Sequence, residues 1–232
     1  MQANIPHVPR TGFDQAPDCT TDITGNEARH LSLAAKRGFD IIAASFLLLI
    51  LLPLFLVIAL FVSMDGGPVF FGHKRVGRGG KTFACLKFRT MITDAEEMLE
   101  DYLALHPEAA EEWRLSRKLE FDPRVTSVGR VLRATSLDEL PQLFNVIKGE
   151  MSLVGPRPIT ETELDRYGSL GSFYKAVRPG ITGLWQVNGR NELSFDQRMF
   201  MDVEYVKSWS LFVDGRILLK TPGVVLSRGG AR

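Results

Sequence analysis

The sequence predicts a helix-rich α+β protein that associates with a membrane. Two observations carry this prediction: residues 41–62 contain no charged residue, and two strand-like segments that flank a glycine-rich turn interrupt an otherwise mainly helical composition. At 232 residues, the chain has room for one packed domain and an added membrane segment. We expect a flexible tail at 1–34, a membrane hairpin at 35–65, and a catalytic domain with interfacial helices at 66–232.

The tail and the membrane segment differ sharply in composition. Residues 1–34 show scattered polar residues and prolines without periodicity, which is typical of a flexible segment. The apolar run at 41–62 would form a helix about 33 Å long, enough to cross a hydrocarbon core. Pro53 removes a backbone hydrogen bond within it, and Lys36 and Arg37 precede it while further basic residues follow. We therefore expect a re-entrant helix–break–helix anchored by Lys36 and Arg37, with a kinked single span as the alternative.

A β-hairpin is expected after the membrane segment, because 69–71 and 82–88 are rich in strand-forming residues and flank glycines at 77–80. Residues 66–93 carry six Lys or Arg and no acid. That block could be a solvated hairpin, but its place beside the membrane segment favours contact with anionic headgroups or phosphates.

Two further helices are predicted. Residues 94–118 have helical periodicity, with acids on one face and a buried face made by Met98, Leu99, Tyr102, Leu103 and Leu105. Residues 205–232 interleave basic residues with Trp and aliphatic residues, which suits a membrane-interface helix and a packed terminal helix equally well.

Composition excludes several classes of function. The four histidines are dispersed and the two cysteines, Cys19 and Cys85, have no metal-ligand spacing, so a zinc hydrolase is not expected. The net charge is +1, and we expect no nucleic-acid partner.

The candidate active site centres on Asp138 and Glu139, two adjacent carboxylates within an apolar stretch. Adjacent acids raise each other's pKa unless cations compensate them, and Arg133 and Arg157 are near in sequence. Mg²⁺ favours one or two carboxylates plus phosphate oxygens, so the pattern predicts phosphoryl transfer with Asp138 as a metal ligand. The alternative is an ordinary helix N-terminus capped by Ser136, with both acids favoured by the helix dipole.

Six ordered motifs from Lys36 to the C-terminus resemble those of the bacterial sugar transferases called monotopic phosphoglycosyl transferases, most of all the exopolysaccharide-initiating galactosyl and glucosyl members. The motifs are Lys36-Arg-Gly-Phe-Asp40, Lys87-Phe-Arg-Thr-Met91, Leu137-Asp-Glu-Leu-Pro-Gln-Leu143, Gly149-Glu-Met-Ser-Leu-Val-Gly-Pro-Arg-Pro158, Arg178-Pro-Gly-Ile-Thr-Gly-Leu-Trp-Gln186 and Gly189-Arg-Asn191. One departure is Leu52-Pro53, where many members have Ser-Pro. This change bears on the stability of the membrane hairpin and not on the chemistry.

The resemblance implies a reaction and a location. A hexose-1-phosphate would pass from a UDP-sugar to undecaprenyl phosphate, releasing UMP, at the cytoplasmic face of the bacterial inner membrane, where exopolysaccharide synthesis begins. Asp138 would be the nucleophile that forms a covalent phosphosugar intermediate, with Glu139 supporting the site and Mg²⁺ balancing charge. Arg133, Arg157 and Arg190 would bind phosphate, and Lys87 and Arg89 would line the site.

Other functions compete with this one. They are a lipid-phosphate phosphatase, a sugar-nucleotide hydrolase, and a non-catalytic scaffold that anchors polysaccharide assembly to the membrane. The sequence does not determine which UDP-sugar is used. It also leaves the oligomeric state open, a homo-oligomer included.

Overall fold

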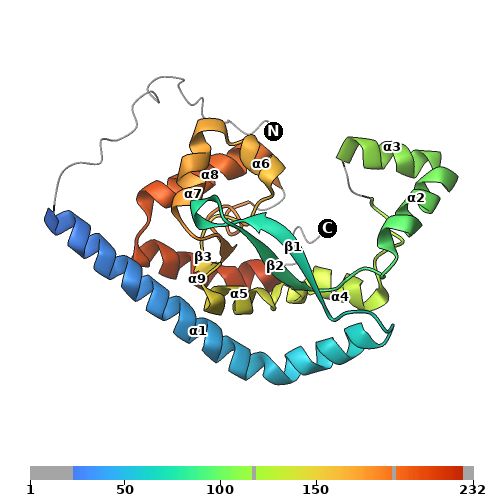
Figure 1. Ribbon diagram of the computed structural model, residues 1–232, viewed down its shortest axis with the longest axis horizontal. Coiled ribbons are helices and arrows are strands. Elements are labelled where there is room, and N and C mark those ends of the chain that lie inside the picture. The colour runs from blue at the N-terminus through green and yellow to red at the C-terminus, as the bar shows by residue number, and fades with distance from the viewer. Residues whose placement is uncertain (1–22, 117–118, 190–191, 227–232) are drawn as a thin grey trace, which may run out of the picture.

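A computed structural model describes residues 23–116, 119–189 and 192–226 as helices around two small sheets (Figure 1). The longest element is α1, Ile23–Ser63, which runs along one side of the molecule. It begins upstream of the tail boundary expected at residue 34. The helix continues through Pro53, and Figure 1 shows it bent rather than straight, because proline removes a backbone hydrogen bond and crowds the preceding turn.

The surface of α1 is apolar and largely uncovered. Among the described residues, one helix segment, Leu31–Ser63, is long and apolar enough to cross a membrane. Large apolar side chains exposed along it include Ile42, Phe46, Leu49, Ile50, Leu56, Leu60 and Phe61. A soluble protein rarely leaves so extended an apolar patch in water, which makes α1 a candidate for membrane association.

The predicted hairpin is confirmed. Strands β1, Phe70–Val76, and β2, Thr82–Phe88, pair antiparallel, with Phe71 opposite Lys87. The turn between them is η1, Arg78–Gly80, in which Gly79 and Gly80 adopt positive φ angles that favour glycine.

The helix predicted at 94–118 is two helices, α2, Ala95–Leu105, and α3, Pro107–Ser116. The expectation of a buried face on the first helix was wrong: α2 has no buried residue, and Met98 and Leu105 are exposed. Figure 1 shows α2 and α3 extending away from the other helices. The periodicity indicated an amphipathic helix, but its apolar residues Leu99, Tyr102 and Leu103 are only half-buried.

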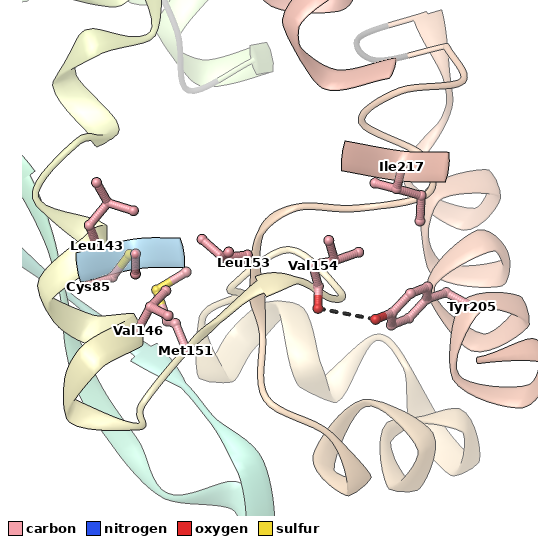
Figure 2. Close-up of a cluster of buried hydrophobic side chains, with 9 residues drawn as sticks. Cys85, Leu143, Val146, Met151, Leu153, Val154, Tyr205 and Ile217 are labelled. Carbon is pink, nitrogen blue, oxygen red and sulfur yellow. Dashed lines mark hydrogen bonds between the residues drawn. The ribbon is translucent and has the colours of Figure 1, made fainter. Parts of the chain in front are cut away.

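The main core joins segments that are far apart in sequence. It includes Ala44 of α1, Cys85 of β2, and residues of α5, Gln142–Lys148. Strand β3, Ser152–Val154, pairs in parallel with β4, Gly180–Thr182. In Figure 2 the Tyr205 hydroxyl donates to the Val154 carbonyl, at 3.1 Å, and Ile217 lies nearby. The remaining elements are α4 (Ser127–Thr135), η2 (Leu137–Glu139), α6 (Glu161–Asp165), η3 (Gly168–Leu170), α7 (Gly171–Ala176), α8 (Phe195–Ser208) and α9 (Leu211–Leu226).

Polar contacts also fasten α1 to this core. Lys36 Nζ donates to Asp214 Oδ2 at 2.6 Å and to the Val154 carbonyl at 3.2 Å. Arg37 donates to the carbonyls of Val146 and Ile147 at the end of α5. Lys36 and Arg37, expected to anchor the membrane segment, thus bond to the domain itself.

Candidate active site

The carboxylate pair lies at a sharp reversal between α4 and α5. Thr126 caps α4 by accepting a hydrogen bond from the Gly129 amide. Ser136 then adopts φ 58°, a left-handed conformation, and η2 places Asp138 and Glu139 immediately after it. The Ser136 side chain makes no capping hydrogen bond. The two acids are therefore not the first turn of a serine-capped helix, which was the alternative interpretation.

Lys87 of β2 bridges the two carboxylates. Its Nζ lies 3.2 Å from Asp138 Oδ2 and 2.7 Å from Glu139 Oε1. The side chains of Lys87, Asp138 and Glu139 are 29%, 10% and 22% exposed. Asp138 Oδ1 accepts no hydrogen bond from the described residues, so one oxygen of this carboxylate is left for chemistry.

The two acids experience opposite pKa shifts. Burial raises the pKa of Asp138, and the Glu139 charge adds to this, while Lys87 and Arg133 oppose it in part. Burial also disfavours the charged form of Glu139, but Lys87, Arg157 and a hydrogen bond with Gln142 outweigh it and lower the pKa of Glu139. The pKa of Lys87 is raised, because its two carboxylate partners outweigh the effect of burial. Lys87 and Glu139 thus stay charged, and Asp138 is the more basic carboxylate.

Arg157 enters the site from the segment that follows β3. Hydrogen bonds on both sides hold this segment to β4: the Gly155 amide donates to Thr182 and the Gly180 amide donates to Pro156. The Arg157 guanidinium lies 5.9 Å from the centre of the Trp185 ring and is close enough to lower the pKa of Glu139. Trp185 is itself buried.

The other predicted phosphate-binding residues separate into three cases. Arg133 donates to Thr90 Oγ1 at 2.9 Å, and its charge acts on Asp138. Arg89, itself buried, instead forms a bidentate ion pair with the exposed Asp65 beyond the end of α1 and donates to the Pro68 carbonyl. Arg190 lies outside the described residues. The structure therefore brings Lys87, Arg133 and Arg157 to the carboxylates and places Arg89 elsewhere.

Sequence reasoning missed one group beside Arg157. Asp202 of α8 is 3% exposed and accepts a hydrogen bond from the Tyr167 hydroxyl at 3.0 Å. Burial raises its pKa to about 8, although Tyr167 and Arg157 oppose this shift. Nothing near Asp202 in the sequence signals its burial, since its neighbours in space come from other segments.

The ligand set fits Mg²⁺ only in part. Within the described residues, no group of three or more His, Cys, Asp or Glu side chains could hold a metal ion. One or two carboxylates suffice for Mg²⁺ when phosphate oxygens complete its coordination, and Asp138 retains an oxygen without a hydrogen bond. A metal would therefore depend on a bound diphosphate.

Comparisons with known proteins identify the family of this chain. Residues 31–228 match the model of the bacterial sugar transferase family. The exopolysaccharide production protein ExoY of Rhizobium meliloti is 57% identical over 84% of this chain and 87% of its own length.

Two relatives have names that state a substrate. The undecaprenyl-phosphate galactose phosphotransferase of Salmonella typhimurium is 52% identical over 90% of this chain, which spans 44% of that protein's length. The UDP-glucose:undecaprenyl-phosphate glucose-1-phosphate transferase of Caulobacter vibrioides is 41% identical over 84% of this chain and 71% of its own length.

Proposed function

The chain belongs to the bacterial sugar transferase family, and from this premise we propose that it transfers hexose-1-phosphate from a UDP-sugar to undecaprenyl phosphate. Galactose and glucose are the sugars favoured, because relatives named for each share 41–52% of their aligned residues with it. The observation that carries the proposal is the Lys87-bridged carboxylate pair, with one Asp138 oxygen free of hydrogen bonds and Arg133 and Arg157 beside it.

Asp138 is the nucleophile in this mechanism. Its carboxylate attacks the sugar-proximal phosphorus, an O–P bond forms, and the bond to the bridging oxygen breaks so that UMP leaves. A phosphate oxygen of undecaprenyl phosphate then attacks the same phosphorus and displaces the carboxylate. Division into two steps suits an enzyme whose two substrates differ so much in polarity.

The surrounding cations have separate roles. Lys87 keeps Glu139 ionised and donates a hydrogen bond to Asp138 Oδ2, so that Asp138 Oδ1 is the oxygen that reacts. Arg157 and Arg133 are the groups placed to bind phosphate oxygens, because a guanidinium meets them bidentately. Asp138, together with the donor diphosphate, would hold Mg²⁺, which would supply charge neutralisation at the phosphates.

The reaction takes place at the cytoplasmic face of the inner membrane, where UDP-sugars are available. The re-entrant reading of α1 places both of its ends on that side, which cationic flanks favour. Cysteines introduced at Ala34 and Met64, both exposed, in a background without Cys19 and Cys85 should both resist a membrane-impermeant maleimide added to intact cells. Labelling of Ala34→Cys alone would mean a single span.

The activity test uses the purified full chain in detergent with UDP-galactose or UDP-glucose. We expect multiple-turnover UMP release only when undecaprenyl phosphate is also present. Without the lipid, we expect at most one UMP per protein molecule, together with a mass increase of one hexose phosphate on the protein. A non-catalytic scaffold would release no UMP from any UDP-sugar. A hydrolase would release many UMP molecules per protein molecule without the lipid.

A further inference from the structure

Arg133 of α4 is bonded to the protein through only one nitrogen of its guanidinium. Its Nε donates to Thr90 Oγ1 at 2.9 Å, and neither terminal amino group bonds a described residue. The residue is exposed. A guanidinium has five N–H donors, one on Nε and four on the terminal amino groups. Arg133 therefore keeps the four terminal donors for a ligand.

The bond to Thr90 decides which edge of this guanidinium a ligand can use. Two N–H groups on one edge of an arginine side chain meet two oxygens of a phosphate. Thr90 occupies the Nε hydrogen, so the edge left for a phosphate is the pair of terminal amino groups. Holding the side chain in place beforehand also reduces the rotamer entropy that binding costs. Thr90 thus prepares Arg133 for bidentate recognition.

Thr90 has a fixed position of its own. Its carbonyl accepts a hydrogen bond from the Thr126 amide at 3.1 Å. A Cβ on Gly129 would lie 2.1 Å from the same carbonyl oxygen, so the first turn of α4 packs directly on this backbone. On the other side, Arg89 donates to the Met91 carbonyl at 2.9 Å. With only 9% of the residue exposed, the Thr90 hydroxyl is held where Arg133 meets it.

The same two segments carry the groups of the active site. Thr90 follows Lys87 by three residues, about 10 Å of extended chain, and Lys87 bonds both carboxylates. At the end of α4, the Ser136 amide donates to the Arg133 carbonyl at 3.2 Å, and η2 with Asp138 follows at once. The bond between Thr90 and Arg133 therefore joins the segment of the bridging lysine to the helix that leads into the nucleophile.

We propose that Thr90 is a positioning residue for donor binding: its hydroxyl orients Arg133 so that the two terminal amino groups bind a phosphate of the UDP-sugar. This inference rests on the proposed function, since it concerns the diphosphate of the same donor. The competing role is a purely structural tie between α4 and the segment after β2. The two roles differ in whether the effect of Thr90 on ligand binding passes through the Arg133 guanidinium.

Calorimetric titration of UDP into the full chain, in an uncharged detergent with Mg²⁺ present, tests this role without any turnover. Thr90→Val keeps the shape of the side chain but removes the hydroxyl. We expect UDP affinity to fall about tenfold, the lower end of what a hydrogen bond to a charged group contributes. Thr90→Ser restores the hydroxyl and should recover most of this affinity. Arg133→Lys keeps the charge but loses the planar fork, so it should weaken UDP binding at least as much as Thr90→Val.

A double-mutant cycle separates orientation of Arg133 from simple packing. The fork is absent in Arg133→Gln, so adding Thr90→Val to it should cause no further loss of UDP affinity. Thr221→Val is the matched control, because the Thr221 hydroxyl donates to the neutral Ile217 carbonyl, at 2.8 Å, instead of bonding a guanidinium. This control should bind UDP as tightly as the wild type.

Several results would overturn the positioning role. They are no UDP binding by the wild type, unaltered binding in Thr90→Val or Arg133→Lys, an equal loss in Thr221→Val, and an undiminished further loss when Thr90→Val is added to Arg133→Gln. Lipid-dependent UMP release by the wild type measures the proposed function separately. Such release with normal UDP binding in Thr90→Val would overturn the positioning role alone, whereas Thr90-dependent UDP binding without UMP release would overturn the proposed reaction alone.

Discussion

Two lysines in this protein each lie near two carboxylates, yet the two clusters differ in how completely their oxygens are bonded. At the attachment of α1, which we call the anchor cluster, Lys36 lies 2.6 Å from Asp214 and 3.8 Å from Asp40. In the active site, Lys87 lies 2.7 Å from Glu139 and 3.2 Å from Asp138. Each cluster thus contains one lysine and two carboxylates.

The anchor cluster has its oxygens fully engaged. Asp214 also accepts hydrogen bonds from the Tyr205 hydroxyl and the Trp209 indole, and Asp40 from Ser152 and Leu153. In the active-site cluster, Asp138 keeps one oxygen without a partner among the described residues. A carboxylate whose oxygens all accept hydrogen bonds holds its neighbours in place, whereas a carboxylate oxygen without a hydrogen bond, beside cations, is available for reaction.

Asp138→Asn should have the largest effect on activity. The amide keeps the shape of the side chain but is a poor nucleophile, so we expect turnover to fall at least a hundredfold, about 2.7 kcal/mol of barrier. UMP release measures this loss, and the thermal unfolding midpoint should change little. Retention of more than about a tenth of the wild-type rate would exclude covalent catalysis by Asp138.

Asp214→Asn is the matched control in the anchor cluster. It makes the same chemical change beside a lysine, but at a carboxylate whose oxygens are engaged. We expect lower thermal stability and nearly unchanged turnover per folded molecule. A loss of turnover equal to that of Asp138→Asn would abolish the distinction between the clusters.

Lys36→Met should destabilise the protein by about 3 kcal/mol or more, because it leaves the buried Asp214 charge without its cation. The midpoint of thermal unfolding in detergent measures this effect. Adding Asp214→Asn to Lys36→Met should recover part of the loss, since the unpaired charge is then gone. Lost activity with an unchanged midpoint would instead place Lys36 in the reaction.

Features signalled by neighbouring residues could be predicted from the sequence. The apolar run, the hairpin and the Asp138–Glu139 pair each depend on residue types within a short stretch, where periodicity or juxtaposition has a direct physical meaning. Lys87, Arg133 and Arg157 were predicted through the family resemblance. That their side chains meet at the two carboxylates could not be predicted, because this depends on the three-dimensional fold.

Partners distant in sequence could not be predicted. Lys36 and Asp214 are 178 positions apart, and no local pattern distinguishes a lysine that faces headgroups from one in an internal ion pair. Arg89 shows the same limit: it belongs to a basic block beside Lys87 but turns to Asp65, where it lowers the pKa of that carboxyl to about 2. Likewise, the amphipathic pattern of α2 does not reveal that none of its residues is fully buried.

Lys87→Met should affect rate and pH dependence together. Lys87 lowers the pKa of both Asp138 and Glu139, so its removal leaves burial to raise them further. We expect a rate loss on the order of tenfold to a hundredfold at neutral pH. The acid limb of kcat/KM should move to higher pH, because Asp138 then stays protonated over more of the range. Lys87→Arg should restore most of this shift, and an unmoved limb in Lys87→Met would contradict the assigned role.

Asp202 is a further buried carboxylate, and it has no lysine partner. We expect its substitution to have the smallest effect of those considered, a change in how stability depends on pH. The folded protein keeps its proton up to about pH 8, whereas the ordinary value is 3.8. The folded state therefore binds more protons than the unfolded state between these values, and stability falls as pH rises through this window. The slope should approach roughly 1 kcal/mol per pH unit near neutrality. Asp202→Asn can still accept the Tyr167 hydrogen bond but cannot ionise, so its thermal midpoint should decline less between pH 6 and pH 7 than that of the wild type. Parallel declines would mean that Asp202 is already ionised at pH 6, and that a buried carboxylate in this protein needs no lysine to hold its charge.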